Sequence, residues 1–260
     1  EMDETYEHLH KVQIQTFNRG RASGSPRVAE GTFNFTKSKG ITSSLLGSFD
    51  PYGRHRYCRL TAFTAQEPEA WGAMHPLWAR IGALFAEHVP DRFAAQMRAI
   101  DAPHPDWVIA GTPFSTITIN NTYPTGVHTD KGDLDEGFSC LAVNRRGRYS
   151  GGVFTFPEFR LAVDLAHGDL ILMDAHEFHG NTFLHCTDCG ERLDEAGHKC
   201  QQGRDSAFFR GDPAYESPER ISTVCYYRTG MATCGSMTEE NAKRGDQIET
   251  RNRRKVGLDA

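Results

Sequence analysis

The 260-residue sequence lacks any apolar run approaching the ~18 residues that span a bilayer, and it shows no signal-peptide pattern. It also lacks the excess of Lys and Arg typical of nucleic-acid-binding domains. The net charge is -5 and the pI is about 6.2, whereas such domains often have a pI above ~9. We therefore expect no membrane partner and no tight general affinity for polynucleotides, although a local basic patch is compatible with this charge.

Cysteine is scarce and odd in number. Seven cysteines cannot all pair with one another, so we expect a reducing, intracellular compartment, with cytoplasm and nucleus undecided. Nothing in the sequence implies a protein partner. Four of the cysteines have no evident partner and are expected to be small buried core residues: Cys58, Cys140, Cys225 and Cys234.

The composition and the spacing of apolar residues change along the chain. Residues 1–60 are polar and predict only short strands, whereas 67–100 carry apolar side chains at helical spacing, with Pro90 separating two helices. From residue 115 onward short β-type runs alternate with turn residues, and the charged tail 239–260 predicts a solvated helix. The expected strands are STITINNTY, FSCLAV, GVFTF, RLAVDL, DLILMD and RISTVCYYR, with turns at YSGG and AHGD.

Short strands that follow a helical layer predict an α+β chain that is mainly β, a sandwich or barrel braced by the N-terminal helices. We expect one domain over residues 1–260, without internal repeats.

The stretch TGVHTDKGD, directly after the predicted strand STITINNTY, places His128 and Asp130 two residues apart. In extended chain such side chains project from the same face, which suits either a metal ion or a buried ion pair. The later stretch GDLILMDAHEFHGN adds His176 and His179 after another strand. Two His and one carboxylate are the ligands of the facial triad of non-haem Fe(II) oxygenases, which leaves the opposite face open for a co-substrate and O2.

A third element is the stretch ERISTVCYYR, in which Arg220 and Ser222 stand at the head of a predicted strand. An oxygenase that uses 2-oxoglutarate needs a fixed cation for the distal carboxylate, and Arg offers a bidentate fork that Lys lacks. Arg228 is the rival for this role.

The ordered set of HxD, GDLILMDAHEFHGNT and RISTVCYYR resembles the Fe(II)/2-oxoglutarate dioxygenases. More narrowly, VHTDKGDLDEGFSCLAV, YSGGVFTFPEFRLAVDLAHGDLILMD and HEFHGNT resemble the TET/JBP branch, which oxidises 5-methylpyrimidines in nucleic acid. The resemblance covers about residues 112–184 and 219–231. It implies a double-stranded β-helix (jelly-roll) core and a catalytic domain, with Fe(II), 2-oxoglutarate and O2 as cofactor and co-substrates.

The resemblance also implies roles for single residues. The residues that fall on the iron ligands are His128, Asp130 and His179. His176 is then a neighbour of the iron site rather than a ligand. Arg220 falls on the residue that anchors 2-oxoglutarate, and Ser222 lies beside it on the same predicted strand.

Two further positions match the base pocket of the family. Asp133 takes the place of a polar contact to the base edge, and Tyr226 takes the place of an aromatic ring that stacks on an extruded base. Because a carboxylate accepts hydrogen bonds and cytosine offers a 4-amino donor, Asp133 favours 5-methylcytosine over thymine. The alternative for Asp133 is a turn cap after Gly.

Residues 185–218 form an insertion relative to the core pattern. It contains CxxC followed by HxC, which supplies a Cys3His set suited to tetrahedral zinc, while CxxC is also the spacing of a redox pair. The proposed zinc ligands are Cys186, Cys189, His198 and Cys200.

The implied reaction is hydroxylation of the 5-methyl group of 5-methylcytosine in DNA, with base flipping because a stacked base cannot reach the iron. The same core could instead act on thymine, a free small molecule or a protein side chain, or the chain could be a zinc-stapled binding module with an inactive core. Candidate phosphate contacts are Arg19, Arg21, Arg27, Lys37, Lys39, Arg145, Arg146 and Arg148.

Overall fold

The structure is a computed structural model that describes residues 1–12, 43–53, 55–187, 189–190, 192–193 and 218–255. The chain forms two compact units. Unit 1 comprises residues 1–44, 118–131 and 140–224, and unit 2 comprises 45–117, 132–139 and 225–260. The chain therefore passes between the units several times, within β3, β4 and β11 among other places. The expectation of one domain stays a prediction.

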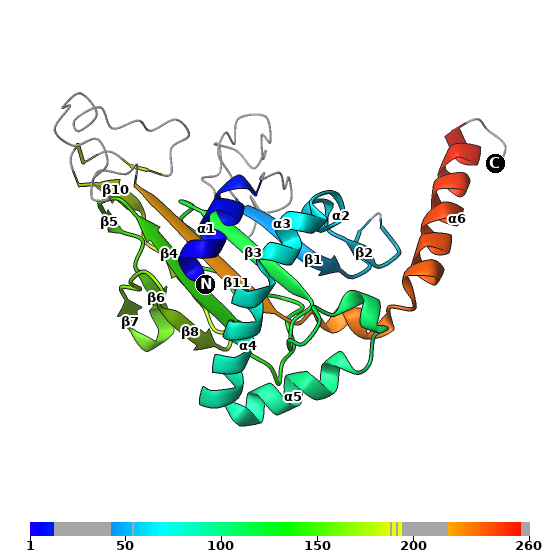
Figure 1. Cartoon of the computed structure of the whole chain (residues 1–260), viewed down its shortest axis with the longest axis horizontal. Coiled ribbons are helices and arrows are strands. Elements are labelled where there is room, and N and C mark those ends of the chain that lie inside the picture. Colours follow the sequence, from blue (N-terminus) through cyan, green and yellow to red (C-terminus); the bar gives the residue numbers. More distant parts are fainter. Residues whose placement is uncertain (13–42, 54, 188, 191, 194–217, 256–260) are drawn as a thin grey trace. The chain divides into compact units, whose positions relative to one another are not determined.

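The elements of the two units follow one another along the chain (Figure 1). The helices are α1 (Met2–Lys11), α2 (Ala62–Gln66), α3 (Pro68–Ala73), α4 (His75–His88), α5 (Pro90–Ile100) and α6 (Met237–Lys255), with 3-10 turns η1 (Pro105–Trp107), η2 (Pro157–Phe159) and η4 (Thr229–Thr233). The strands are β1 (Ser43–Phe49), β2 (Arg59–Leu60), β3 (Thr116–Asn121), β4 (Ser139–Arg146), β5 (Tyr149–Gly151), β6 (Phe154–Phe156), β7 (Leu161–Val163), β8 (Leu170–Met173), β9 (Gly180–Asn181), β10 (Leu184–Cys186) and β11 (Glu219–Tyr226).

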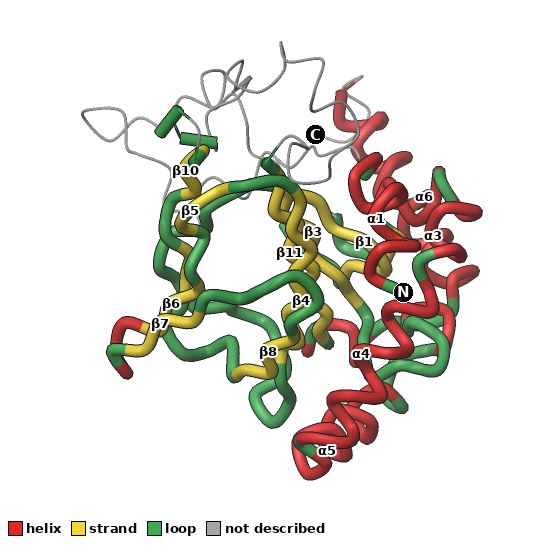
Figure 2. Tube along the Cα trace, turned by 60° about the vertical axis from the view of Figure 1, so that its left-hand side comes forward, coloured by secondary structure: helices red, strands yellow, loops and turns green. Residues whose placement is uncertain are grey.

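Unit 1 contains the predicted β-helix core. Strands β3, β11, β4 and β8 are neighbours in this order, and two smaller sheets have the orders β10-β5 and β7-β6-β9. The pairs β5–β10, β6–β7 and β6–β9 are antiparallel. In Figure 2 the strands β5, β6, β7 and β10 lie opposite β3, β11 and β4. The predicted α+β class is confirmed by this mixture of helices and antiparallel sheets, and the arrangement of the strands is consistent with the predicted jelly-roll core.

The strands of this core are buried on both faces rather than on one. All residues of β11 and the first five of β3 are buried, with Ile117, Ile119 and Ile221 fully covered. β-branched side chains favour extended chain because they pack well on a pleated surface. Thr and Ile alternate along β3, but both faces of the strand are covered, which makes β3 an inner strand.

Unit 2 contains the helical layer that the sequence predicted. Pro90 begins α5 directly after α4, and the chain turns sharply there (Figure 1). Pro is favoured at the first helical position because its missing N–H has no intrahelical partner there. Leu77, Trp78, Ile81 and Phe85 form the buried face of α4. The predicted tail helix is α6, although it begins at Met237.

Two predictions were wrong. YSGG was expected to be a turn, but residues 149–151 form β5, which pairs with β10 in the register Cys186↔Tyr149. The glycines mark the end of this strand instead, with positive φ at Gly151 and Gly152. The N-terminal helix α1 was missed, because the polar composition of residues 1–60 concealed it.

The second wrong prediction concerns Cys58 and Cys234. Both are buried, as expected, but they form a disulfide across a sequence separation of 176 residues within unit 2. Only tertiary structure brings residues so distant together, so no local pattern could indicate this pair. Cys140 and Cys225 are buried, as predicted. No helix in the described part of the chain is long and apolar enough to cross a membrane.

Candidate metal centre

The loop after β3 carries His128 and Asp130, and main-chain hydrogen bonds attach it to the segment before β9. The N–H of His128 donates to the carbonyl of His179 and the N–H of His179 donates to the carbonyl of His128, both at 2.9 Å. The N–H of Asp130 donates to the carbonyl of Ala175 at 2.9 Å. The backbone thereby brings together side chains that are about fifty residues apart in the sequence.

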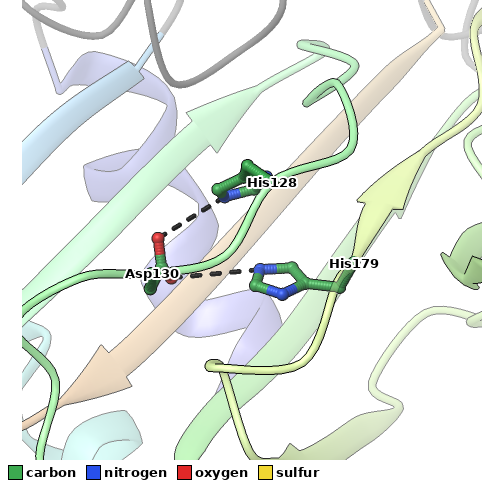
Figure 3. Close-up of side chains that lie close together, drawn as sticks. All are labelled: His128, Asp130 and His179. Carbon is green, nitrogen blue, oxygen red and sulfur yellow. Dashed lines mark ion pairs between the residues drawn. The ribbon is translucent and has the colours of Figure 1, made fainter. Parts of the chain in front are cut away.

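The three side chains converge on one point (Figure 3). His128 Nε2 lies 3.4 Å from Asp130 Oδ1, and His179 Nε2 lies 3.9 Å from Asp130 Oδ2. One ligand atom from each residue lies within 4.8 Å of the others. This cluster, which we call the His-Asp-His cluster, can hold a metal ion.

Hydrogen bonds to the far side of each ring fix which nitrogen faces the cluster. His128 Nδ1 lies 2.8 Å from the carbonyl of Gly126, and His179 Nδ1 lies 2.8 Å from the carbonyl of Glu177. A carbonyl accepts only, so Nδ1 of each ring carries the hydrogen, and in the neutral imidazole Nε2 then keeps its lone pair. Metal-binding histidines are commonly held in this way.

Burial reinforces the neutral state of His179. The side chain is only 4% exposed, and the ring of Phe154 is stacked on it with 5.7 Å between centroids. Burial, followed by the electrostatic effect of His128, lowers the pKa of His179, although the hydrogen bond to Glu177 opposes the shift. A neutral imidazole is the form that binds a metal.

His176, the other candidate in this stretch, lies outside the cluster. Its Nδ1 lies 2.8 Å from Asp174 Oδ1, which also accepts a hydrogen bond from the His176 N–H at 3.0 Å. Asp174 therefore holds the ring through Nδ1. Among the described residues, the group that can hold a metal contains His179 and not His176.

Gly180 is required by the packing of the loop that carries His128. A Cβ at this position would lie 2.9 Å from the carbonyl oxygen of Thr125 and 3.0 Å from the N of Val127. Both atoms belong to the backbone, so the loop rather than a flexible side chain would have to move.

Gly180→Ala is therefore expected to destabilise the protein by about 1–3 kcal/mol, as overpacking does, and to weaken metal binding by displacing His128. Thermal unfolding and metal titration check both effects. Gly72→Ala is the matched control, because a Cβ at Gly72 meets nothing within 4 Å. Equal behaviour of the two variants would show that the loop absorbs the methyl group without cost.

Arg220 lies on β11 in unit 1 and is only 3% exposed. Burial lowers the pKa of its guanidinium, and Nη2 has no hydrogen-bond partner among the described residues. Segment 152–154 touches both Arg220 and the metal centre: a Cβ at Gly152 would lie 3.1 Å from Arg220 Cδ, and Phe154 stacks on His179. Ser222 is buried two residues further along β11.

Arg228, the rival for the anchor role, is already neutralised within unit 2. Its Nε donates to Asp50 Oδ1 at 2.6 Å and its Nη2 donates to Asp50 Oδ2 at 3.4 Å. The guanidinium also lies over the ring of Phe49, 4.4 Å from the centroid. Burial alone would lower the pKa of Arg228, but the charges of Tyr226, Asp50 and Asp133, together with the hydrogen bond to Asp50, raise it.

The two predicted base contacts, Asp133 and Tyr226, are buried residues of unit 2. Ser139 Oγ donates to Asp133 Oδ2 at 2.8 Å, and Asp133 forms a β-bridge with Arg228. Their proposed roles toward a base stay predictions.

The zinc prediction is covered only in part by the structure. Cys186 is buried on β10 and Cys189 is half-buried, whereas His198 and Cys200 lie outside the described residues. Zinc therefore stays a prediction.

Two of the expected phosphate contacts have partners within unit 1. Arg145 Nη1 donates to Asp164 Oδ1 at 3.0 Å, and Arg146 Nη2 donates to Asp3 Oδ1 at 2.5 Å. Each guanidinium also covers an aromatic ring, Tyr149 for Arg145 and Tyr6 for Arg146. Arg148 is exposed, and the candidates at positions 19, 21, 27, 37 and 39 lie outside the described residues.

Comparisons with known proteins match this architecture. The family model Tet_JBP, described as the oxygenase domain of the 2OGFeDO superfamily, matches residues 49–229. Two curated relatives named thymine dioxygenase JBP1 are 34% identical over 200 residues (Leishmania braziliensis) and 38% identical over 188 residues (Leishmania major).

These alignments cover 76% and 71% of the chain but 21% and 22% of the relatives, so the chain spans about a fifth of their length. A solved structure described as NgTET1 in complex with 5mC DNA has a TM-score of 0.51 at 12% identity, over 76% of this chain and 64% of that one. This last likeness is one of fold alone.

Proposed function

Because the chain belongs to the Tet_JBP family of 2OGFeDO oxygenases, we propose that it hydroxylates the 5-methyl group of a pyrimidine base in DNA, with Fe(II), 2-oxoglutarate and O2. The observation that carries the proposal is the His-Asp-His cluster, whose ligand atoms lie within 4.8 Å of one another. Two neutral imidazoles and one carboxylate suit Fe(II) and leave coordination positions open.

The buried residues around the cluster fit the co-substrate as well. Iron held there, with 2-oxoglutarate and O2, would supply the chemistry: one oxygen atom enters the methyl C–H bond and the other enters succinate, with release of CO2. The chain's own residues bind and orient. The guanidinium of Arg220, whose Nη2 has no hydrogen-bond partner in the described part of the chain, offers a charge-assisted hydrogen bond to a carboxylate.

The substrate must reach the cluster as an extruded base, because a base that stays stacked in the duplex cannot bring its 5-methyl group to the metal centre. Extrusion costs roughly a few kcal/mol. We propose Tyr226 as the ring that stacks on the extruded base and Asp133 as the group that contacts its edge.

For the base itself, two candidates each have an observation in favour. The carboxylate of Asp133 would accept a hydrogen bond from the 4-amino group of 5-methylcytosine. Thymine is favoured by the relatives named thymine dioxygenase and by the Ser139 hydroxyl, which already occupies Asp133 Oδ2. We propose 5-methylcytosine as the substrate, and thymine is the second candidate.

The test is anaerobic loading with Fe(II), then turnover with 2-oxoglutarate on matched duplexes that contain either 5-methylcytosine or thymine at the target position. Mass spectrometry of the nucleosides measures the 5-hydroxymethyl products. Turnover of free nucleosides or of peptides, with no rate increase on duplex DNA, would contradict the proposed substrate class. A metal-loaded chain that consumes no 2-oxoglutarate would contradict the proposed enzyme.

Asp133→Ala is expected to lower kcat/KM on 5-methylcytosine roughly ten- to hundredfold without loss of iron, because it removes a hydrogen bond to a charged group. Asp133→Asn is expected to have a milder effect on kcat/KM. It should raise the activity on thymine relative to that on 5-methylcytosine, because an amide adds a hydrogen-bond donor. Tyr226→Ala is the matched control, because stacking does not distinguish the two bases. A wild-type preference for thymine, or an unchanged preference in Asp133→Ala, would remove the support for 5-methylcytosine.

A further inference from the structure

Two buried polar atoms of unit 1 lie near each other and have no hydrogen-bond partner among the described residues. They are Arg220 Nη2 and the hydroxyl oxygen of Tyr149, on side chains that are 3% and 7% exposed as whole residues. Buried polar atoms are nearly always hydrogen-bonded, because leaving one without a partner costs the free energy of its lost hydration. Two such atoms in one place indicate a bound polar group.

Several contacts place Tyr149 beside Arg220. The charge of each group shifts the pKa of the other. Leu184 is a shared neighbour: it packs in one apolar cluster with Tyr149, and a Cβ at Gly152 would meet both Leu184 Cγ, at 3.2 Å, and Arg220 Cδ, at 3.1 Å.

The ring of Tyr149 is held in a fixed place. The guanidinium of Arg145 lies over it, 4.4 Å from the centroid, and is itself bound to Asp164 Oδ1 and to the carbonyl of Leu165. Arg145 lies close enough to the phenol to lower its pKa, and the hydroxyl oxygen has no hydrogen-bond partner of acceptable geometry among the described residues. The hydroxyl is therefore available to a ligand.

The charges define what this ligand must be. Burial raises the pKa of Tyr149 to about 12, so the phenol keeps its hydrogen and can donate it. A guanidinium has donors only. One cation and one neutral donor in the same neighbourhood suit a single anion with two acceptor oxygens, which is a carboxylate.

We infer that Tyr149 donates its hydroxyl hydrogen to the same carboxylate that Arg220 binds, and so selects a dicarboxylic 2-oxo acid over a monocarboxylic one. The inference rests on the proposed function, since it concerns the co-substrate of that site. It adds a selectivity residue from β5, a stretch in which the sequence predicted a turn.

The test is calorimetric titration of the Mn(II)-loaded full chain, which avoids turnover, with 2-oxoglutarate and with pyruvate, which lacks the distal carboxylate. Tyr149→Phe is expected to lower the affinity for 2-oxoglutarate roughly ten- to hundredfold, the usual effect of a lost hydrogen bond to a charged group. The affinity for pyruvate is expected to stay unchanged. Its ligand-free Tm is expected to be unchanged or higher, because the deleted hydroxyl has no partner among the described residues.

Tyr57→Phe is the matched control, since the Tyr57 hydroxyl contacts His55 Nδ1 in unit 2; this variant is expected to bind 2-oxoglutarate like wild type. Unchanged 2-oxoglutarate affinity in Tyr149→Phe, an equal loss for both acids, or a lowered ligand-free Tm would overturn the inference about Tyr149 alone. Wild-type protein that binds Mn(II) but not 2-oxoglutarate would overturn the proposed function together with it.

Discussion

Alanine at His128, Asp130 or His179 is expected to abolish turnover and to lower the affinity for Fe(II) by more than ~100-fold. Each residue offers one of the three protein ligand atoms of the cluster, and loss even of a group that only orients a ligand typically costs ~10- to 100-fold in metal affinity or activity. Iron content after anaerobic loading, and hydroxylated product per enzyme, are the measurements.

His176→Ala is the matched control for these variants. Its ring is bound to Asp174 and lies outside the cluster, so the variant is expected to retain iron. Loss of iron in His176→Ala, with iron retained in His179→Ala, would show that the distal ligand was assigned to the wrong histidine.

Methionine at Arg220 and at Arg228 is expected to give opposite results. Arg220→Met should lower 2-oxoglutarate affinity roughly 30-fold to several thousandfold, because truncating one partner of a buried charge pair costs ~2–5 kcal/mol. Ligand-free stability should not fall, since the lost guanidinium was buried and its Nη2 has no hydrogen-bond partner among the residues that the structure describes. Arg228→Met should instead lower the free energy of unfolding by about 3 kcal/mol, because it leaves the Asp50 carboxylate without its counter-charge.

Urea unfolding of the ligand-free protein and titration of the Mn(II)-loaded protein with 2-oxoglutarate separate the two effects. Asp50→Asn is the matched companion to Arg228→Met: it breaks the same ion pair from the other side and should likewise leave 2-oxoglutarate affinity unchanged. If Arg228→Met lost the co-substrate while Arg220→Met retained it, the anchor would be Arg228.

Local patterns in the sequence were sufficient for much of the fold and for the residues of the cluster. Pro90 marked a helix start, short β-type runs between turn residues marked six strands, and HxD followed by a later His-Gly identified residues that the structure brings together. Each of these signals lies within a few consecutive residues. Such short-range signals are readable because the spacing of side chains within a few residues is set by the geometry of a helix or of an extended chain.

What the sequence left open depends on partners that are distant in the chain. Arg220 and Arg228 are eight residues apart, so an alternating pattern places both on the same side and cannot distinguish them. The partner that neutralises Arg228, Asp50, lies 178 residues away. The disulfide is similarly non-local, and the role inferred for Tyr149 was not suggested by the sequence, because the two glycines after it resemble a turn.

The reciprocal main-chain pair between His128 and His179 has a consequence for the order of assembly. Backbone hydrogen bonds between His128 and His179, which form when the chain folds, set the distance between these two ligands. Each of the two rings is oriented by the carbonyl two residues before it in the chain. The conformational entropy lost in ordering these segments is therefore a cost of folding rather than of metal capture. Unlike a zinc finger, whose folding waits for its ion, this centre can be complete before iron arrives, so maturation in the cell can proceed as folding first and metal loading second.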